Sequence, residues 1–166
     1  MVQQELQQKI ETHMAQIGVI GMGYVGLPLA VCAAGVGFPV LGFDVSHERV
    51  NALNRGESYI GDISSGLLQE LRQTGMLEAT TDMRRLRACD LVIICVPTPL
   101  NDTRDPDMRH VEQAGEDIAR MLRAGQLVIL ESTTYPGTTE ELVQSRLEAT
   151  GLRVGEDIFL AFSPER

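Results

Sequence analysis

The chain carries the stretch Val19-Ile20-Gly21-Met22-Gly23-Tyr24-Val25-Gly26, and this stretch decides the fold that we predict. The apolar run 17–20 leads into it, which is typical of a buried parallel strand. After it, residues 27–36 carry small apolar side chains at helical spacing, and a second apolar run, 38–43, ends at Asp44. Strand, glycine turn, helix, strand and acidic residue therefore follow one another as in a nucleotide-binding βαβ unit.

Each glycine has a separate role in such a unit. Gly21 allows the tight turn, Gly23 lets the backbone approach a pyrophosphate, and Gly26 lets the helix pack closely on its strand. The phosphates are expected at the helix N-terminus, where free N–H groups and the helix dipole favour negative charge. Asp44 is expected to accept hydrogen bonds from an adenosine ribose and to repel a 2′-phosphate, which favours NAD over NADP. The alternative is a purely structural turn, because glycines also mark ordinary turns.

Composition and charge agree with an α/β domain that folds around its own core. Of the 166 residues, 43% are hydrophobic and 4% aromatic, and the formal net charge of −9 argues against nucleic-acid binding. No apolar run is long enough to span a membrane and the N-terminus lacks the apolar core of a signal peptide, so a cytoplasmic protein is expected. Cys32, Cys89 and Cys95 have unrelated spacings that fit neither a disulfide framework nor a metal site.

Residues 1–14 stand apart as an N-terminal helical extension of the domain that residues 15–166 are expected to form. Apolar side chains recur in this segment every four residues among Gln and Glu, namely Val2, Leu6, Ile10 and Met14. The spacing predicts one amphipathic helix. This helix either packs on its own domain, which is the simpler interpretation, or contacts a partner subunit.

From residue 17 onward, strand-like and helix-like segments alternate. Strands are predicted at 17–20, 38–43, 77–80, 90–96, 127–131 and 158–162. Helices are predicted at 24–36, 46–54, 64–74, 109–124 and 138–149, and Ser46 is expected to cap the second. The alternation predicts an α/β Rossmann fold, a doubly wound parallel sheet of six strands in the order 3-2-1-4-5-6. The polar loop 97–108 follows a central strand, where long loops commonly carry function.

Turn-forming, hydroxyl and acidic residues gather at the predicted carboxyl ends of the strands, where open α/β sheets bind their ligands. The informative stretches are Gly21-Met22-Gly23-Tyr24-Val25-Gly26-Leu27-Pro28, Val96-Pro97-Thr98-Pro99, Glu131-Ser132-Thr133-Thr134-Tyr135-Pro136-Gly137 and Ser163-Pro164-Glu165-Arg166. In this order they resemble the UDP-glucose/GDP-mannose dehydrogenases, most closely the bacterial UDP-N-acetylglucosamine 6-dehydrogenase branch. The resemblance covers the chain from residue 16 to residue 166.

The resemblance implies an enzyme that oxidises the C6 alcohol of a nucleotide sugar to a carboxylate, using two NAD molecules in turn. It implies that Tyr24 and Val25 contact the pyrophosphate through backbone groups, and that Arg49 lies along the ribose or the adenine beside Asp44. An arginine at this place can also hold a 2′-phosphate, which weakens the case for strict use of NAD. The segment Val96-Pro97-Thr98 is expected to line the cofactor site at the end of the fourth strand.

Two catalytic residues are implied by the same resemblance. Thr133, also expected at the cofactor site, matches a threonine that helps to position a water and the reacting groups. Glu165 matches a glutamate assigned to acid/base work or water activation. A hydroxyl is no general base at neutral pH, so Thr133 should orient, whereas a glutamate can act as base if burial raises its pKa. The simpler alternatives are a hydroxyl that satisfies the backbone at Thr133 and a solvated side chain at Glu165. His13, His47 and His110 are expected at the surface.

The family's nucleophilic cysteine lies in a later domain, and none of the three cysteines matches it. Its central helix and most of its sugar-binding residues also lie later, so we expect a truncated piece that binds NAD without turnover. The whole enzyme is expected to be a homo-oligomer that acts on UDP-N-acetylglucosamine, with UDP-glucose and UDP-N-acetylmannosamine as alternative substrates. A different Rossmann oxidoreductase and a non-catalytic dinucleotide-binding module stay open as other classes.

Overall fold

A parallel sheet of six strands forms the centre of the computed structural model, which describes residues 2–100 and 106–164. Its strands are β1 Ile17–Ile20, β2 Val40–Phe43, β3 Leu77–Thr80, β4 Leu91–Ile94, β5 Leu127–Leu130 and β6 Phe159–Phe162. They lie in the order β3-β2-β1-β4-β5-β6, and every neighbouring pair is parallel. The predicted fold class, strand number and strand order are confirmed.

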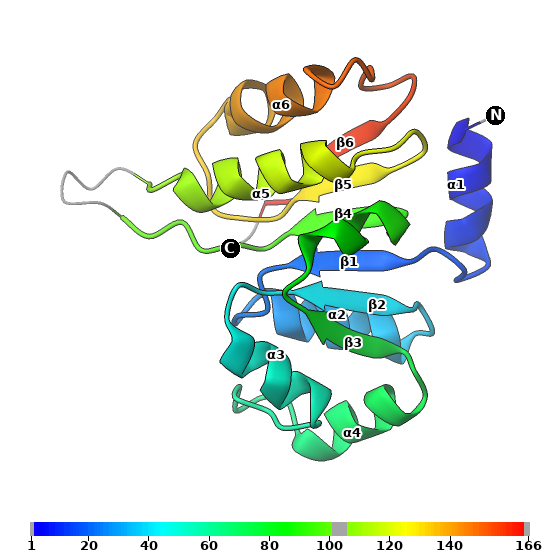
Figure 1. Ribbon diagram of the computed structural model, residues 1–166, viewed down its shortest axis with the longest axis vertical. Coiled ribbons are helices and arrows are strands. Elements are labelled where there is room, and N and C mark those ends of the chain that lie inside the picture. Colours follow the sequence, from blue (N-terminus) through cyan, green and yellow to red (C-terminus); the bar gives the residue numbers. More distant parts are fainter. Residues whose placement is uncertain (1, 101–105, 165–166) are drawn as a thin grey trace.

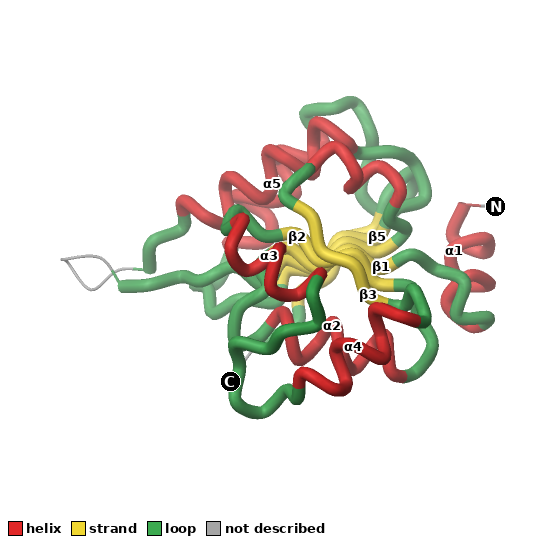
Figure 2. The backbone as a smooth tube through the Cα atoms, turned by 60° about the horizontal axis from the view of Figure 1, so that its bottom comes forward, coloured by secondary structure: helices red, strands yellow, loops and turns green. Residues whose placement is uncertain are grey.

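The central strands β1, β2 and β4 are buried along their whole length because helices cover both faces of the sheet (Figure 2). On one face lie α2 Gly26–Gly35, α3 His47–Asn54 and α4 Ser65–Gln73. Leu27, Leu53 and Leu68 from these helices share a core with Val19 of β1. Burial on both faces explains why these strands are continuous apolar runs without polar alternation.

The opposite face carries the elements that follow β3, β4 and β5 along the chain. They are η1 Met83–Ala88, α5 Arg109–Met121, η2 Thr139–Gln144 and α6 Ser145–Glu148. Leu86, Ile118 and Leu147 from these elements pack with Val92 of β4 in a second core. Since all strands run in one direction, their carboxyl ends meet at one edge of the sheet, which faces left in Figure 1.

The structure differs from the sequence-based prediction mainly at segment ends. Helix α5 ends at Met121, short of the predicted 124, because Leu122 already has an extended backbone. The short 3-10 helix η1 was not predicted at all. It begins after Asp82, whose side chain accepts a hydrogen bond from the Arg84 N–H. The predicted helix 138–149 is divided into the π-helix η2 and the α-helix α6, and the Ser145 hydroxyl at their junction bonds a carbonyl four residues back.

The N-terminal helix α1, Val2–Glu11, lies at the amino ends of the strands, opposite their carboxyl ends (Figure 1). Leu6 is buried in the core shared by α2 and α4, so the helix packs on its own domain. The prediction of a helix over 1–14 was wrong at its end. His13 has a left-handed backbone with φ of 57°, and Met14 is 73% exposed, outside the buried stripe.

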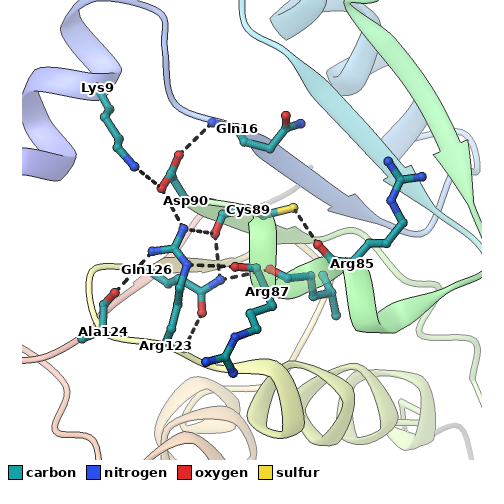
Figure 3. A network of polar contacts seen from close by, with 10 residues as sticks. Lys9, Gln16, Arg85, Arg87, Cys89, Asp90, Arg123, Ala124 and Gln126 are labelled. Carbon is teal, nitrogen blue, oxygen red and sulfur yellow. Dashed lines mark hydrogen bonds and ion pairs between the residues drawn. The ribbon is translucent and has the colours of Figure 1, made fainter.

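Asp90, directly before β4, ties α1 to the sheet (Figure 3). Its buried carboxylate accepts hydrogen bonds from Lys9 Nζ at 2.7 Å, Arg123 Nη2 at 2.8 Å and the Gln16 N–H at 3.0 Å. Lys9 is the only lysine in the chain. Burial on its own works to raise the pKa of Asp90, and the bonds from Lys9, Arg123 and Gln16 outweigh it, so the pKa is lowered. The charged form of Asp90 is therefore part of the folded structure.

Two of the three cysteines belong to the cores. Cys95 is buried on the α2 side of the sheet and Cys89 on the α5 side, whereas Cys32 is exposed on α2. Burial, followed by the negative charge of Asp90, raises the pKa of Cys89 to about 12. At neutral pH the Cys89 thiol is therefore protonated and unreactive. In the part of the chain that the structure describes, no helix has both the length and the apolar character needed to cross a bilayer.

Candidate dinucleotide site

The carboxyl ends of β1, β2, β4 and β5 border one cleft of about 460 Å³, at the place where the strand order reverses between β1 and β4. A second hollow of about 590 Å³ adjoins it on the side of α3 and shares Asp44 and Arg49 in its wall. All but one of the predicted cofactor-binding residues line the first cleft, namely Gly21, Gly23, Tyr24, Val25, Asp44, Arg49, Val96, Pro97, Thr98 and Thr133. The remaining one, Gly26, is buried behind the turn.

The three glycines of the turn meet different steric conditions. Gly21 has a positive φ of 92°, and a Cβ on it would come within 2.5 Å of the Cys95 carbonyl oxygen. A Cβ on Gly26 would lie 1.7 Å from the Gly21 carbonyl oxygen, so only glycine lets α2 start this close to β1. A Cβ on Gly23 would meet no atom within 4 Å. Gly21 and Gly26 are thus required by the protein itself, while Gly23 faces open space.

The N-terminus of α2 lacks the capping that the neighbouring helices have. Ser46 accepts a hydrogen bond from the Arg49 N–H at the start of α3, as predicted, and Ser64 does the same for α4. At α2 the N-cap residue is Val25, and no side chain caps the helix. Within residues 2–100 and 106–164, no acceptor receives the N–H groups of Gly23, Tyr24, Val25 and Gly26. Unsatisfied N–H groups at a helix N-terminus are an anion site, which fits the pyrophosphate of a dinucleotide.

Asp44 is buried at the end of β2, only 5% exposed, and braces the turn. Oδ2 accepts the Met22 N–H at 3.0 Å and Oδ1 accepts the Ser46 N–H at 2.9 Å. The Arg49 guanidinium approaches Oδ2 at 3.4 Å. A carboxylate has about four acceptor positions, so Asp44 keeps capacity for a ribose hydroxyl.

The opposite wall of the cleft is held together by hydroxyl groups. The Thr98 hydroxyl donates to the Thr133 carbonyl at 2.6 Å, and the buried Ser132 hydroxyl donates to the Val96 carbonyl at 3.0 Å. These bonds join the chain after β4 to the chain after β5. The Thr133 hydroxyl itself makes no hydrogen bond to any described residue. Thr98 and Ser132 therefore satisfy the backbone here, whereas Thr133 borders the cleft and its hydroxyl has no partner among the described residues.

Several residues around the cleft could not be assigned to it from the sequence. Met83 of η1 borders it, and so do Gln113 and Asp117 of α5. Tyr59 contributes to the adjoining hollow and contacts the glycine turn directly. Met83, Gln113 and Asp117 occur in no recognisable motif. The only signal for Tyr59 was an aromatic residue in an otherwise irregular segment, which is too weak to place it.

The other residues that the sequence analysis singled out are Glu165 and the three histidines. Glu165 lies outside the described residues, so its position is not part of this structure. His13 and His47 are exposed and away from the cleft, and His13 stacks on Phe38 with ring centroids 4.5 Å apart. His110 is also exposed, but it borders the cleft.

An open glycine turn, an uncapped helix N-terminus and a buried acid at the next strand end, all at the reversal of a doubly wound sheet, define a Rossmann domain that binds dinucleotides. Residues 15–166 match the NAD-binding domain of the UDP-glucose/GDP-mannose dehydrogenase family, and the chain belongs to this family. Its cofactor is therefore NAD.

Relatives with different sugar substrates are about equally similar to the chain. It is 40% identical to a UDP-N-acetyl-D-glucosamine 6-dehydrogenase from Pseudomonas aeruginosa, over 91% of this chain and 35% of the relative. It is 39% identical to a UDP-N-acetyl-D-mannosamine dehydrogenase from Pyrococcus horikoshii, over 91% of this chain and 36% of the relative. A crystal structure of a ternary complex of the GDP-mannose dehydrogenase from Pseudomonas aeruginosa superposes with a TM-score of 0.84 at 34% identity, covering 90% and 36% of the two chains. The chain thus spans about a third of the length of these relatives.

Proposed function

We propose that this chain is the NAD-binding domain of a nucleotide-sugar 6-dehydrogenase, with UDP-N-acetylglucosamine as the substrate of the complete protein. The observation that carries the cofactor part is the group of four N–H groups at the start of α2 that have no acceptor among the described residues, next to the open space at Gly23. Bound NAD supplies the hydride acceptor for the oxidation of a sugar C6 alcohol.

The residues of this chain hold and orient the reactants. The N–H groups from Gly23 to Gly26 bind the pyrophosphate, and Asp44 accepts hydrogen bonds from the adenosine ribose. The Arg49 guanidinium lies beside that ribose. On the opposite wall, the Thr133 hydroxyl orients a water and the reacting groups, and it cannot serve as a base at neutral pH. We assign the proton transfers to Glu165.

The choice of the sugar rests on the sequences of the motifs after β5 and β6, because the resemblance implies that most sugar contacts lie in a later domain. The motifs are Glu131-Ser132-Thr133-Thr134-Tyr135-Pro136-Gly137 and Ser163-Pro164-Glu165-Arg166. UDP-N-acetylmannosamine is the nearest alternative. A UDP-N-acetyl-D-mannosamine dehydrogenase is about as similar to the chain as the UDP-N-acetyl-D-glucosamine 6-dehydrogenase.

A glycine-to-alanine pair tests the cofactor site. In Gly23→Ala the added methyl group meets no protein atom, so the domain should fold and melt like the wild type. The methyl group enters the space proposed for the pyrophosphate, and we expect NAD affinity measured by calorimetry to fall roughly tenfold or more.

Gly35→Ala is the matched control. Gly35 ends the same helix, and a Cβ there also meets nothing within 4 Å, but it lies outside the cleft. Its NAD affinity should equal that of the wild type. Undiminished binding of NAD by Gly23→Ala, or no binding by the folded wild type, would overturn the proposal.

A further inference from the structure

Tyr59 approaches the glycine turn from a separate part of the chain. It lies in the irregular segment between α3 and α4, and its hydroxyl donates a hydrogen bond of 2.5 Å to the Met22 carbonyl oxygen. The neighbours of Tyr59 are fixed. The Ser58 N–H donates to the Ser65 hydroxyl at 3.0 Å, the Ser58 hydroxyl donates to the Ile60 carbonyl at 2.9 Å, and Ile60 is buried. The tyrosine is therefore held on both sides where it meets the turn.

Met22 is anchored at both of its peptide groups. Its N–H donates to Asp44 Oδ2 at 3.0 Å and its carbonyl accepts from Tyr59. The described peptide bonds are all trans, so the Gly23 N–H points opposite to the Met22 carbonyl within the same plane. Because Tyr59 fixes the direction of that carbonyl, it also fixes the direction of the Gly23 N–H. That N–H has no acceptor in the described chain and adjoins the open space at Gly23.

The Tyr59 hydroxyl is a donor at all pH values at which the domain is expected to work. Burial, followed by the negative charge of Asp44, raises the pKa of Tyr59 to about 12, and the positive charge of Arg49 opposes this. The Arg49 guanidinium lies 5.8 Å from the centroid of the Tyr59 ring, within the range of a cation–π contact. The same guanidinium bonds Asp44, so Tyr59, Arg49 and Asp44 form one unit around Met22.

We propose that Tyr59 is a positioning residue for the dinucleotide pyrophosphate, acting through the Met22 carbonyl on the Gly23 N–H. This inference rests on the proposed NAD site and adds a residue that no motif indicates. Tyr59 itself touches the turn and not the phosphate. Its effect should therefore appear with every ligand that carries a pyrophosphate and be absent with ligands that lack one.

The test compares Tyr59→Phe with the wild type in calorimetric titrations with NAD, ADP and adenosine, the last by competition with NAD. The variant keeps the ring and its contact with Arg49 and loses only the hydroxyl. We expect affinity for NAD and ADP to fall about five- to tenfold, as for one lost hydrogen bond, while adenosine binding stays unchanged. The melting temperature without ligand should fall by only about 2–4 °C, as for the loss of one hydrogen bond of roughly 1 kcal/mol in a domain of this size.

Tyr135→Phe is the control for loss of a tyrosine hydroxyl, because Tyr135 lies after β5 and outside the cleft. It should bind NAD, ADP and adenosine like the wild type. Wild-type affinity of Tyr59→Phe for ADP would refute the positioning role, and so would an equal loss of adenosine affinity. If the wild type itself does not bind NAD, the proposed function fails, which this series distinguishes from a failure of Tyr59 alone.

Discussion

Asp44 combines two tasks at the scale of single residues. The sequence predicts it as the ribose acceptor, and the structure shows in addition that it holds the glycine turn through the Met22 N–H. This second contact could not be predicted, because it depends on how β2 is placed beside β1. The register pairs Ile20 with Phe43, which sets Asp44 directly beside the turn. A local motif and a tertiary contact thus converge on one carboxylate.

Replacement of Asp44 by Asn removes the charge that repels a 2′-phosphate. NAD affinity should fall about tenfold or more, because hydrogen bonds to a charged acceptor are among the stronger ones. NADP affinity should fall less, so that the NAD/NADP preference in calorimetry narrows. In Arg49→Met we expect the opposite change in preference, since the cation that tolerates a 2′-phosphate is lost. An unchanged ratio in both variants would contradict the assignment of Asp44.

At the scale of elements, the sequence determines most of the helices and strands but not all of their ends. Ser46 and Ser64 begin their helices as capping residues should, and the strands are apolar runs as burial on both faces demands. The helix η1 and the π-helix η2 have no such pattern. Each is short and is held by contacts with α5. Such elements depend on the packing around them more than on their own residues.

The attachment of α1 through Asp90 predicts a pH-dependent stability. The pKa of Asp90 is lowered in the folded protein, so its contribution is present above the unfolded value of about 3.9 and is lost as pH falls below it. Asp90→Asn should therefore lower the free energy of unfolding by roughly 1–3 kcal/mol at pH 7. The difference from the wild type should shrink toward pH 3 in urea titrations.

Asp62→Asn serves as the control for this experiment, because Asp62 is exposed and has no hydrogen bond to a described residue. It should follow the wild type at every pH. A constant gap between Asp90→Asn and the wild type from pH 7 to pH 3 would show that the charge of Asp90 has no role in holding α1.

At the scale of the whole molecule, the sheet order is what creates the site. Strands β2 and β3 lie on one side of β1, and strands β4 to β6 lie on the other. The segments after β1, β2, β4 and β5 therefore meet at one cleft. Residues as distant in sequence as Tyr24 and Thr133 share its wall. Because the chain covers only 35–36% of the length of the compared relatives, the reaction stays a proposal for the complete protein.

The complete gene product should form NADH with UDP-N-acetylglucosamine faster than with UDP-N-acetylmannosamine or UDP-glucose. Thr133→Ala should lower kcat about tenfold or more by misplacing the reacting groups, while NAD affinity stays near the wild-type value. Thr134→Ala is the matched control, because the neighbouring threonine lies outside the cleft. A preference for another sugar would correct the substrate, and an unchanged kcat in Thr133→Ala would remove that residue from catalysis.

The sequence by itself determined the dinucleotide class, the strand order and ten of the residues that line the cleft, because glycine turns and buried strands are set by local sterics and apolar periodicity. Only the tertiary structure decided which groups stay unpaired. It paired the Thr98 and Ser132 hydroxyls with backbone carbonyls, left the Thr133 hydroxyl without a hydrogen bond to any described residue and brought Tyr59 to the turn. These outcomes depend on distances between segments far apart in the chain, and no local pattern encodes such distances.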